Sequence, residues 1–367
     1  MMTIKSYVPI LRWKLGEILA MERLYPKDRE SMTPLIEFIM PAPTTDKKDY
    51  NKILEDSKSK FLRVLPGVTH QIIKSWGKSP ILVDVHLLDG DIRTRAFEEI
   101  LSSASTLDIF AIPVVYIIPV TSTDADMNTR QIAIKYSKIN NRGLCIRIDR
   151  SHLDNDNIAE HIENFVKENK LNIENTDILV DLQVVDKDTK TDSVVEKLSR
   201  LPNINKWRSF IVSGGAFPKD LSDLSKHEHH QLERFDWILW KNIISNRTLK
   251  RQPIFSDYTI QHPIFYGSVP GANTSASIRY TNDEKWEIMR GEGLRNPKGA
   301  GHKQYPGHAQ LMVKASFFKG AGYSFGDGYI ALRASPDNKN NGSPTTWVTA
   351  GINHHLTLVA RQITDLL

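Results

Sequence analysis

The chain has 367 residues, of which 40% are hydrophobic and 25% charged, and its formal net charge is +5. This composition is ordinary for a globular protein, and the mildly basic charge favours an anionic partner such as nucleic acid or a phosphorylated metabolite. Cys145 is the single cysteine, which excludes an internal disulfide and a thiolate metal cluster, and the lack of a long apolar run or a signal-peptide hydrophobic region predicts a cytoplasmic protein without membrane insertion.

The first predicted element sets a pattern that recurs along the chain. Residues 7–14 form a short apolar strand that becomes polar at its end, and an amphipathic helix begins near Glu17. The eight predicted strands cover residues 7–14, 33–39, 80–88, 111–119, 143–149, 176–185, 208–212 and 253–258. Helical periodicity between them predicts helices over residues 47–76 (broken near Pro66), 94–103, 126–140, 156–169, 191–201 and 232–244.

This alternation predicts an α/β protein with a (β/α)8 TIM-like barrel. The strands start mostly about every 32 residues, which is the length of one strand–helix unit. They are apolar on both faces, as parallel strands covered by helices must be. An open doubly wound sheet is the alternative, but it usually has fewer units and a glycine-rich turn after the first strand, which Leu15-Gly16-Glu17 does not supply.

The character of the sequence changes after His262. We therefore expect residues 1–262 to form the barrel and residues 263–367 to form a C-terminal α+β extension packed on its rim. Within the extension the pattern predicts a hairpin over residues 276–290 and helices over residues 308–318 and 351–366.

Polar residues recur at the ends of the predicted strands, where the working residues of such barrels lie. Side-chain alternation predicts which of them point inward. They are Arg12, Lys14, Glu37, Asp84, His86, Tyr116, Arg147, Asp149, Asp181, Gln183, Ser213, Asp257 and Tyr258. Because unpaired buried charges are costly, this ring is either an ion-pair network that closes the mouth or a polar pocket for an anionic or multi-hydroxyl ligand.

Metal-assisted cleavage of a phosphodiester is the first chemistry that such a pocket suggests. A divalent cation, Mg or Mn, would clamp the phosphate, and His86 or Lys14 would act as acid or base. The predicted metal ligands are Asp84, Asp149, Asp181 and Asp257, and the predicted catalytic residues are Lys14, Glu37, Asp84, His86 and Asp181.

Other chemistries remain open. Arg12 and Arg147 would contact phosphate directly, with or without metal. Glu37 and Asp181 are a carboxylate pair of the kind used for glycoside cleavage, although aromatic platforms are few. Lys14 at the end of the first strand suits a Schiff base, with an ordinary ion-pair lysine as the alternative.

Two further segments add candidate ligand-binding residues. Ser213-Gly214-Gly215 follows the seventh predicted strand, where many barrels bind phosphate through backbone N–H groups, and an ordinary tight turn is the alternative. The extension carries basic residues interleaved with aromatic ones, which suits single-stranded nucleic acid, unless the hairpin simply packs Trp286 on the barrel. The predicted ligand-binding residues are Arg12, Tyr116, Arg147, Gln183, Ser213, Gly214, Tyr258, Arg279 and Arg290.

The chain resembles the phage- and bacteria-encoded family called "beta family protein". The resemblance spans essentially the whole chain and rests on the segments 7–17, 33–37, 277–281, 286–291, 304–305 and 351–356. It implies a role in phage–host conflict, that is, antiviral defence, but no reaction. We expect a barrel that binds nucleic acid or a nucleotide, with hydrolase activity as a phosphodiesterase or nuclease; the alternative is a non-catalytic module that binds a protein partner from a phage or a defence operon.

Overall fold

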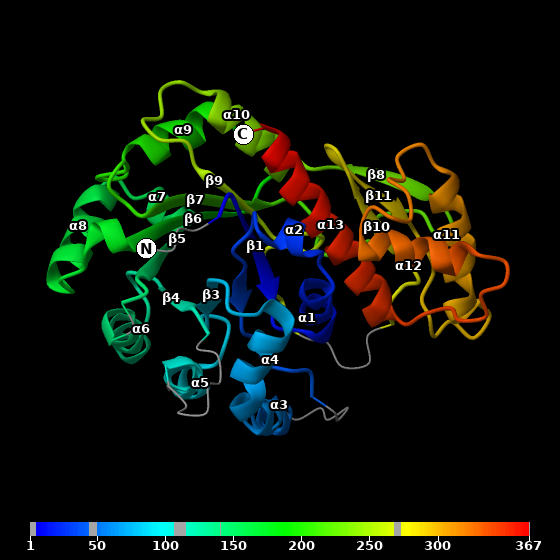
Figure 1. The fold of residues 1–367 in the computed structure, drawn as a ribbon, viewed down its shortest axis with the longest axis horizontal. Coiled ribbons are helices and arrows are strands. Elements are labelled where there is room, and N and C mark those ends of the chain that lie inside the picture. Colours follow the sequence, from blue (N-terminus) through cyan, green and yellow to red (C-terminus); the bar gives the residue numbers. More distant parts are fainter. Residues whose placement is uncertain (1–4, 44–49, 106–114, 140, 268–272, 367) are drawn as a thin grey trace.

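The computed structural model describes residues 5–43, 50–105, 115–139, 141–267 and 273–366. Within these residues eight parallel strands close a barrel, in the order in which they occur along the chain (Figure 1). They are β1 (Tyr7–Arg12), β2 (Leu35–Glu37), β3 (Ile81–Asp84), β4 (Ile117–Thr121), β5 (Leu144–Asp149), β6 (Thr176–Val184), β7 (Ser209–Gly215) and β9 (Ile254–Asp257). The predicted (β/α)8 architecture is therefore confirmed.

Helices connect the strands and cover the outside of the barrel (Figure 1). They are α1 (Leu15–Glu22), α2 (Pro26–Arg29), α3 (Tyr50–Val64), α4 (Val68–Trp76), α5 (Gly90–Ser105), α6 (Met127–Ile139), α7 (Arg150–Leu153), α8 (Ile158–Glu168), α9 (Thr191–Ser199) and α10 (Phe235–Ser245). Short 3-10 turns lie at Leu65–Gly67, Ile173–Asn175 and Gly301–Lys303. No helix in the described part of the chain is long and apolar enough to cross a membrane.

Alternate side chains of each strand enter two different cores. In β1, Val8 and Ile10 belong to the cluster that fills the barrel interior, whereas Tyr7 and Leu11 belong to the cluster between the strands and the helices. This follows from the two-residue period of a strand. The same alternation brings the next inward residue, Arg12, to the end of the barrel, in register with Glu37.

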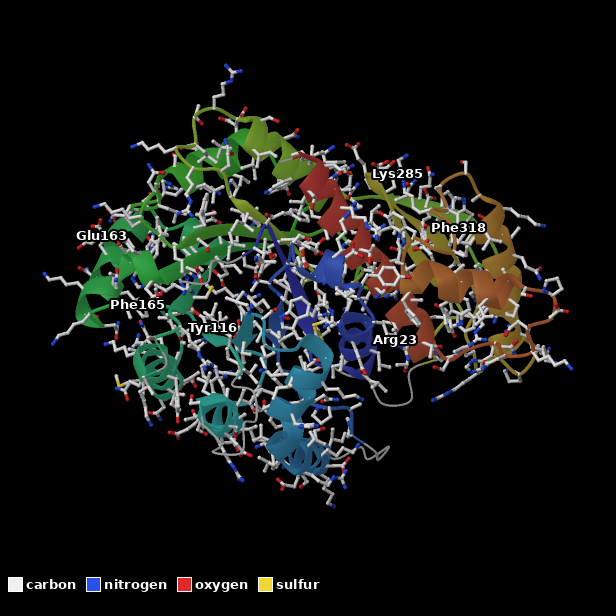
Figure 2. The ribbon with its side chains drawn as sticks, viewed as in Figure 1. Arg23, Tyr116, Glu163, Phe165, Lys285 and Phe318 are labelled. Atoms are coloured by element: carbon white, nitrogen blue, oxygen red, sulfur yellow. The ribbon has the colours of Figure 1, made fainter. Side chains whose placement is uncertain are left out.

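The C-terminal part adds a small sheet and three helices. Antiparallel β8 (His229–Glu233), β11 (Lys285–Met289) and β10 (Ile278–Asn282) form a sheet with β11 in the centre. The helices are α11 (Gln304–Lys314), α12 (Phe325–Ala334) and α13 (Pro344–Leu366). Arg23, the residue directly after α1, is labelled in Figure 2. Its guanidinium lies 4.5 Å from the centre of the ring of Phe325, the first residue of α12, so the end of α1 meets the start of α12.

The long helix α13 lies between the barrel and the small sheet (Figure 1). Thr349 donates a hydrogen bond to the carbonyl of Gly16, and Asn353 donates one to the carbonyl of Ala20, so α13 is fixed along α1. A Cβ at Gly16 would lie 3.3 Å from a methyl group of Val348, which shows how closely the two helices pack.

Several predicted boundaries were wrong. Residues 232–234 were predicted as the start of a helix, but β8 ends at Glu233 and α10 begins at Phe235. The fourth strand was predicted over 111–119; β4 runs from Ile117 to Thr121, and residues 111–114 lie outside the described part. In the extension, α12 was missed and α13 begins seven residues earlier than predicted.

Candidate functional site

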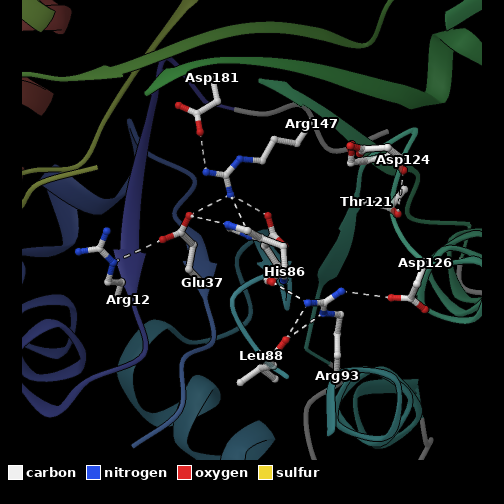
Figure 3. Close-up of polar contacts among 12 residues, drawn as sticks. Arg12, Glu37, His86, Leu88, Arg93, Thr121, Asp124, Asp126, Arg147 and Asp181 are labelled. Carbon is white, nitrogen blue, oxygen red and sulfur yellow. Dashed lines mark hydrogen bonds and ion pairs between the residues drawn. The ribbon is translucent and has the colours of Figure 1, made fainter. Parts of the chain in front are cut away.

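Arg147 occupies the centre of the barrel mouth. Its Nη1 lies 2.8 Å from Asp84 and 2.9 Å from Glu37, and its Nη2 lies 2.7 Å from Asp181 (Figure 3). The three carboxylates come from β2, β3 and β6, and each is almost fully buried. Burial lowers the pKa of Arg147, but the surrounding acidic groups raise it well above its ordinary value. The guanidinium is therefore a permanent cation held by protein carboxylates.

Tyr258 closes this network from the side of β9. Its hydroxyl donates a hydrogen bond to Asp181 at 2.6 Å and accepts one from the Arg147 Nη2 at 2.7 Å. Because the Tyr258 hydroxyl is hydrogen-bonded to both Arg147 and Asp181, these two side chains have little freedom to rearrange.

His86 is the group of this network that reaches solvent, with 46% of its side chain exposed. Its Nδ1 lies 3.0 Å from Asp84, and its Nε2 lies 3.8 Å from Glu37. Burial lowers the pKa of His86, but the Asp84 and Glu37 carboxylates outweigh this effect and raise it above the ordinary value. Burial raises the pKa of Asp84, yet His86 and Arg147 hold it well below its usual range. The Asp84–His86 pair can therefore hold and release a proton.

A pocket of about 300 Å³ opens beside this network, over the ends of β3, β4, β5 and β6. Its charged lining is predominantly acidic. The residues that line it are Asp84, Val85, His86, Arg93, Val120, Thr121, Ser122, Asp124, Ala125, Asp126, Thr129, Arg147, Asp149, His152, Asp181 and Gln183. Five of them are aspartates and two are arginines. The guanidinium of Arg93 donates hydrogen bonds to the carbonyls of His86 and Leu88 and to the Asp126 carboxylate (Figure 3).

The other half of the mouth is covered by the chain that follows β9. Arg12 holds this segment in place, because its Nη2 donates to the carbonyls of His262 and Pro263 at 2.8 and 2.7 Å. Pro263 in turn packs over Gly215, where a Cβ would lie only 3.0 Å from the proline ring. Arg12, which was predicted to bind a ligand, therefore anchors the cover, and its Nε lies 3.6 Å from Glu37.

The four predicted metal ligands do not come together. Asp84 and Asp181 hold Arg147, while Asp149 caps α7 by accepting hydrogen bonds from the backbone N–H groups of Ser151 and His152. Asp257 points out of the barrel, where Tyr7 donates to it and His355 lies 2.8 Å away. In the described residues no group of three or more His, Cys, Asp or Glu side chains is arranged to hold a metal ion. The prediction that these acids converge was therefore wrong.

Several predicted ligand-binding residues lie away from the pocket. Tyr116 directly precedes β4, at the opposite end of the barrel, and stacks with Arg142. Ser213 and Gly214 belong to β7 itself rather than to a turn after it, and Ser213 is fully buried in the barrel. Arg279 and Arg290 lie in or next to the small sheet, and Arg290 donates to the carbonyls of Leu221 and Gly291.

The structure also assigns residues to the pocket that the sequence did not indicate. Asp124 and Asp126 follow β4, and they were missed because the predicted strand ended two residues too early, at Pro119. His152 was missed because it lies on α7 rather than on a strand; its Nδ1 lies 2.8 Å from Asp149 and its Nε2 3.4 Å from Asp124. The polar loop after β4 was the feature of the sequence that could have indicated these pocket residues.

The backbone adds independent evidence for a specialised site. Gln183 and Thr259 are non-glycine residues with φ of 55° and 58°, and they follow Asp181 and Asp257 at the ends of β6 and β9. Such left-handed conformations cost energy and gather at functional sites. The Gln183 N–H donates to the Asp181 carboxylate at 2.9 Å, so the bend also orients a residue of the Arg147 network.

The sequence model of a protein family described as Beta protein matches residues 7–361 of the chain. No curated protein matches the chain.

Proposed function

The chain belongs to the Beta protein family, and for this member we propose that the open pocket binds a small ligand rich in hydrogen-bond donors, such as an amine or a polyol, and that His86 exchanges a proton with it. The proposal rests on the charge of the pocket lining. The lining contains five aspartates and two arginines, and both arginines are already paired with protein carboxylates.

The electrostatic argument concerns which groups can still bind a ligand. Arg147 has its terminal nitrogens committed to three carboxylates and Tyr258. Asp124, Asp126 and Asp149 have side chains that are 67%, 41% and 38% exposed. Carboxylates accept hydrogen bonds and attract cations, whereas they repel phosphate. The pocket therefore favours ammonium, guanidinium or hydroxyl groups.

Proton transfer is assigned to His86 because of its place in the site. The imidazole lines the pocket and is oriented by the Asp84 carboxylate at 3.0 Å. A histidine held in this way is suited to general acid–base work. A ligand hydroxyl or ammonium in the pocket is the group with which it would exchange a proton.

Phosphate binding, nuclease activity and a role in phage–host conflict stay predictions. The binding of a nucleotide would need a cation that offsets the aspartates of the pocket, so it is expected to depend on Mg²⁺ or Mn²⁺. The alternative of a non-catalytic module for a protein partner predicts that no small ligand stabilises the chain.

Thermal unfolding of the purified chain distinguishes these outcomes. We expect agmatine, putrescine or adenosine at saturating concentration to raise the Tm by about 2 °C, whereas AMP and inorganic phosphate without metal leave it unchanged. Stabilisation by AMP or phosphate alone would contradict the proposal. No shift with any of these probes, with or without Mg²⁺, would favour the protein-recognition module.

A matched pair of variants locates the binding. Asp124→Asn removes an exposed charge from the pocket, and we expect it to weaken the binding of the active probe about tenfold, since a charge-assisted hydrogen bond contributes about 1.5–3 kcal/mol. Asp156→Asn is the control, because Asp156 is 93% exposed and lies outside the pocket in a surface pair with Arg200. Equal affinity in both variants would place the ligand elsewhere.

A further inference from the structure

The covered half of the mouth holds an amine that is not in an ion pair. Lys14 is the residue that begins α1, and its Nζ lies 5.0 Å from the centre of the Phe265 ring. Among the described residues no carboxylate lies within ion-pair distance of this Nζ. The ordinary ion-pair lysine, which was the alternative to a Schiff-base lysine, is therefore not what the structure contains.

The surroundings of Lys14 lower its pKa. The guanidinium of Arg12 lies 5.2 Å from the centre of the same Phe265 ring, so two cations contact one aromatic ring. Burial lowers the pKa of Lys14, Glu17 opposes this effect, and Arg12 lowers the pKa further. A lysine that loses its proton more readily is a better nucleophile at neutral pH.

A second titratable group lies one helical turn away. Glu17 stands three residues after Lys14 at the start of α1, is only 2% exposed, and accepts a hydrogen bond from the Gln261 amide. Burial raises the pKa of Glu17 more than Gln261 and Lys14 lower it. A carboxyl group in this position can give a proton to a ligand bound at Lys14.

We propose that Lys14 is a nucleophilic amine that forms an imine with a ketone or aldehyde carrying a negative charge. This activity goes beyond the acidic pocket and involves the opposite half of the mouth. The preference for an anion comes from the cations gathered on two consecutive rings. Lys219 lies 3.9 Å from the centre of the ring of Tyr266, the residue that follows Phe265, and Arg12 and Lys14 both contact the Phe265 ring.

The chemical step balances without an added oxidant or reductant. The neutral Nζ of Lys14 attacks the carbonyl carbon, so a carbon–nitrogen bond forms as the carbon–oxygen double bond becomes a single bond. One of the two Nζ protons moves to the oxygen, which becomes a hydroxyl. Glu17 then donates a proton to this hydroxyl, which leaves as water while the carbon–nitrogen double bond forms, and the nitrogen returns its remaining proton to Glu17. The products are the imine and one water molecule.

Reductive trapping tests the proposal on the full chain. The protein is incubated with pyruvate and sodium cyanoborohydride, which delivers hydride to an imine carbon, and the adducts are mapped by peptide mass spectrometry. We expect Lys14 to be modified faster than Lys135, because the neutral fraction of an amine at a given pH increases as its pKa falls. Lys135 is the matched control, since it is exposed, pairs with Glu98 at 3.1 Å and has a raised pKa. Trapping at Lys14 no faster than at Lys135 would overturn the proposal.

Three variants separate reactivity from structure. Lys14→Arg should abolish the preferred adduct while the circular dichroism spectrum is retained, and an unchanged adduct yield would contradict the assignment. Glu17→Gln should slow trapping but should not slow acetylation of Lys14 by an active ester, since acetylation needs no loss of water. Lys219→Gln should slow trapping by pyruvate but not by neutral hydroxyacetone; equal effects on both would refute the preference for an anion.

Discussion

Arg147 determines what the barrel mouth can bind, since it joins carboxylates from three strands. Asp84, Glu37 and Asp181 lie within 2.7 to 2.9 Å of its terminal nitrogens. Bringing three carboxylates together in a buried site without a cation would be prohibitive. The guanidinium is thus primarily a structural counter-ion, and the side chains left to meet a ligand are those around it, above all His86 and the exposed aspartates.

Replacing Arg147 tests this role. In Arg147→Met the three carboxylates lose their common partner, and we expect the free energy of unfolding to fall by about 3–5 kcal/mol in urea titrations. Arg200→Met removes a guanidinium whose partner Asp156 is 93% exposed, so the change there should stay below about 1 kcal/mol. A similar small loss in both variants would show that Arg147 is not the counter-ion of a buried network.

The protonation of His86 gives a pH dependence with a defined sign. Its pKa in the folded chain is raised above the ordinary value of 6.5. The charged imidazole therefore stabilises the folded state below the unfolded pKa, and this contribution is lost as pH rises through the folded pKa. The Tm of the wild type should exceed that of His86→Gln by more at about pH 6 than at about pH 8. A difference that grows with rising pH would contradict the assigned direction.

At the scale of elements, local periodicity identified the barrel and most of its mouth. Arg12, Glu37, Asp84, Arg147 and Asp181 were predicted to point inward, and they do so because each lies at or near the C-terminal end of an apolar strand with a clear two-residue period. Predicting that acids converge at a metal failed, since the sequence does not reveal that one arginine occupies their centre.

Other failures have specific physical causes. Asp257 and Tyr258 are adjacent polar residues, and only the strand register shows that Tyr258 faces inward. Proline usually marks the end of a strand, so the strand was predicted to end at Pro119. Pro119 instead lies within β4 opposite Val83, and the loop that lines the pocket therefore begins later than predicted. The strand β8 pairs with Trp286 and its neighbours, more than 50 residues away, and local periodicity cannot detect such a partner.

The outward-facing Asp257 joins the barrel to α13. It accepts hydrogen bonds from the Tyr7 hydroxyl and the Thr259 N–H, and it lies 2.8 Å from His355 of α13. Burial raises the pKa of Asp257, but His355, Arg234 and Tyr7 hold it below its ordinary value. The carboxylate is thus an acceptor for groups on three elements, and α13 is docked partly through it.

Removing this acceptor should loosen α13. In Asp257→Ala the buried donors lose their partner, and we expect a loss of about 3 kcal/mol in unfolding free energy together with faster amide hydrogen exchange over residues 344–366. Asp283→Ala is the control, since that side chain is 69% exposed and makes one long contact with Lys319 at 3.4 Å. Unchanged exchange in α13 after the Asp257 substitution would refute this docking role.

Across the whole molecule, the C-terminal part contributes to the hydrophobic core around the barrel strands and also forms a second buried cluster of its own. Ile352, Leu356, Val359 and Ile363 of α13 belong to the same buried cluster as Tyr7 and the outer faces of the other barrel strands. Trp286 and Ile288 of β11 belong to it as well, and β8 leaves the barrel region to complete their sheet. The chain therefore crosses between the two parts more than once, which favours cooperative folding of the whole.

The last prediction concerns the division of the chain at residue 262. A fragment of residues 1–262 would expose the face of β1 and β9 that α13 covers, and Asp257 would lose His355. We expect the fragment to lack a cooperative thermal transition and to bind a hydrophobic dye, whereas the full chain unfolds in one transition by both calorimetry and circular dichroism. Adding the separately expressed residues 263–367 should restore part of the transition, because the missing core would then be supplied in trans. A fragment that unfolds cooperatively on its own, with a free energy of unfolding in the usual range of about 5–15 kcal/mol, would instead establish the barrel as an independent domain and α13 as a dispensable cover.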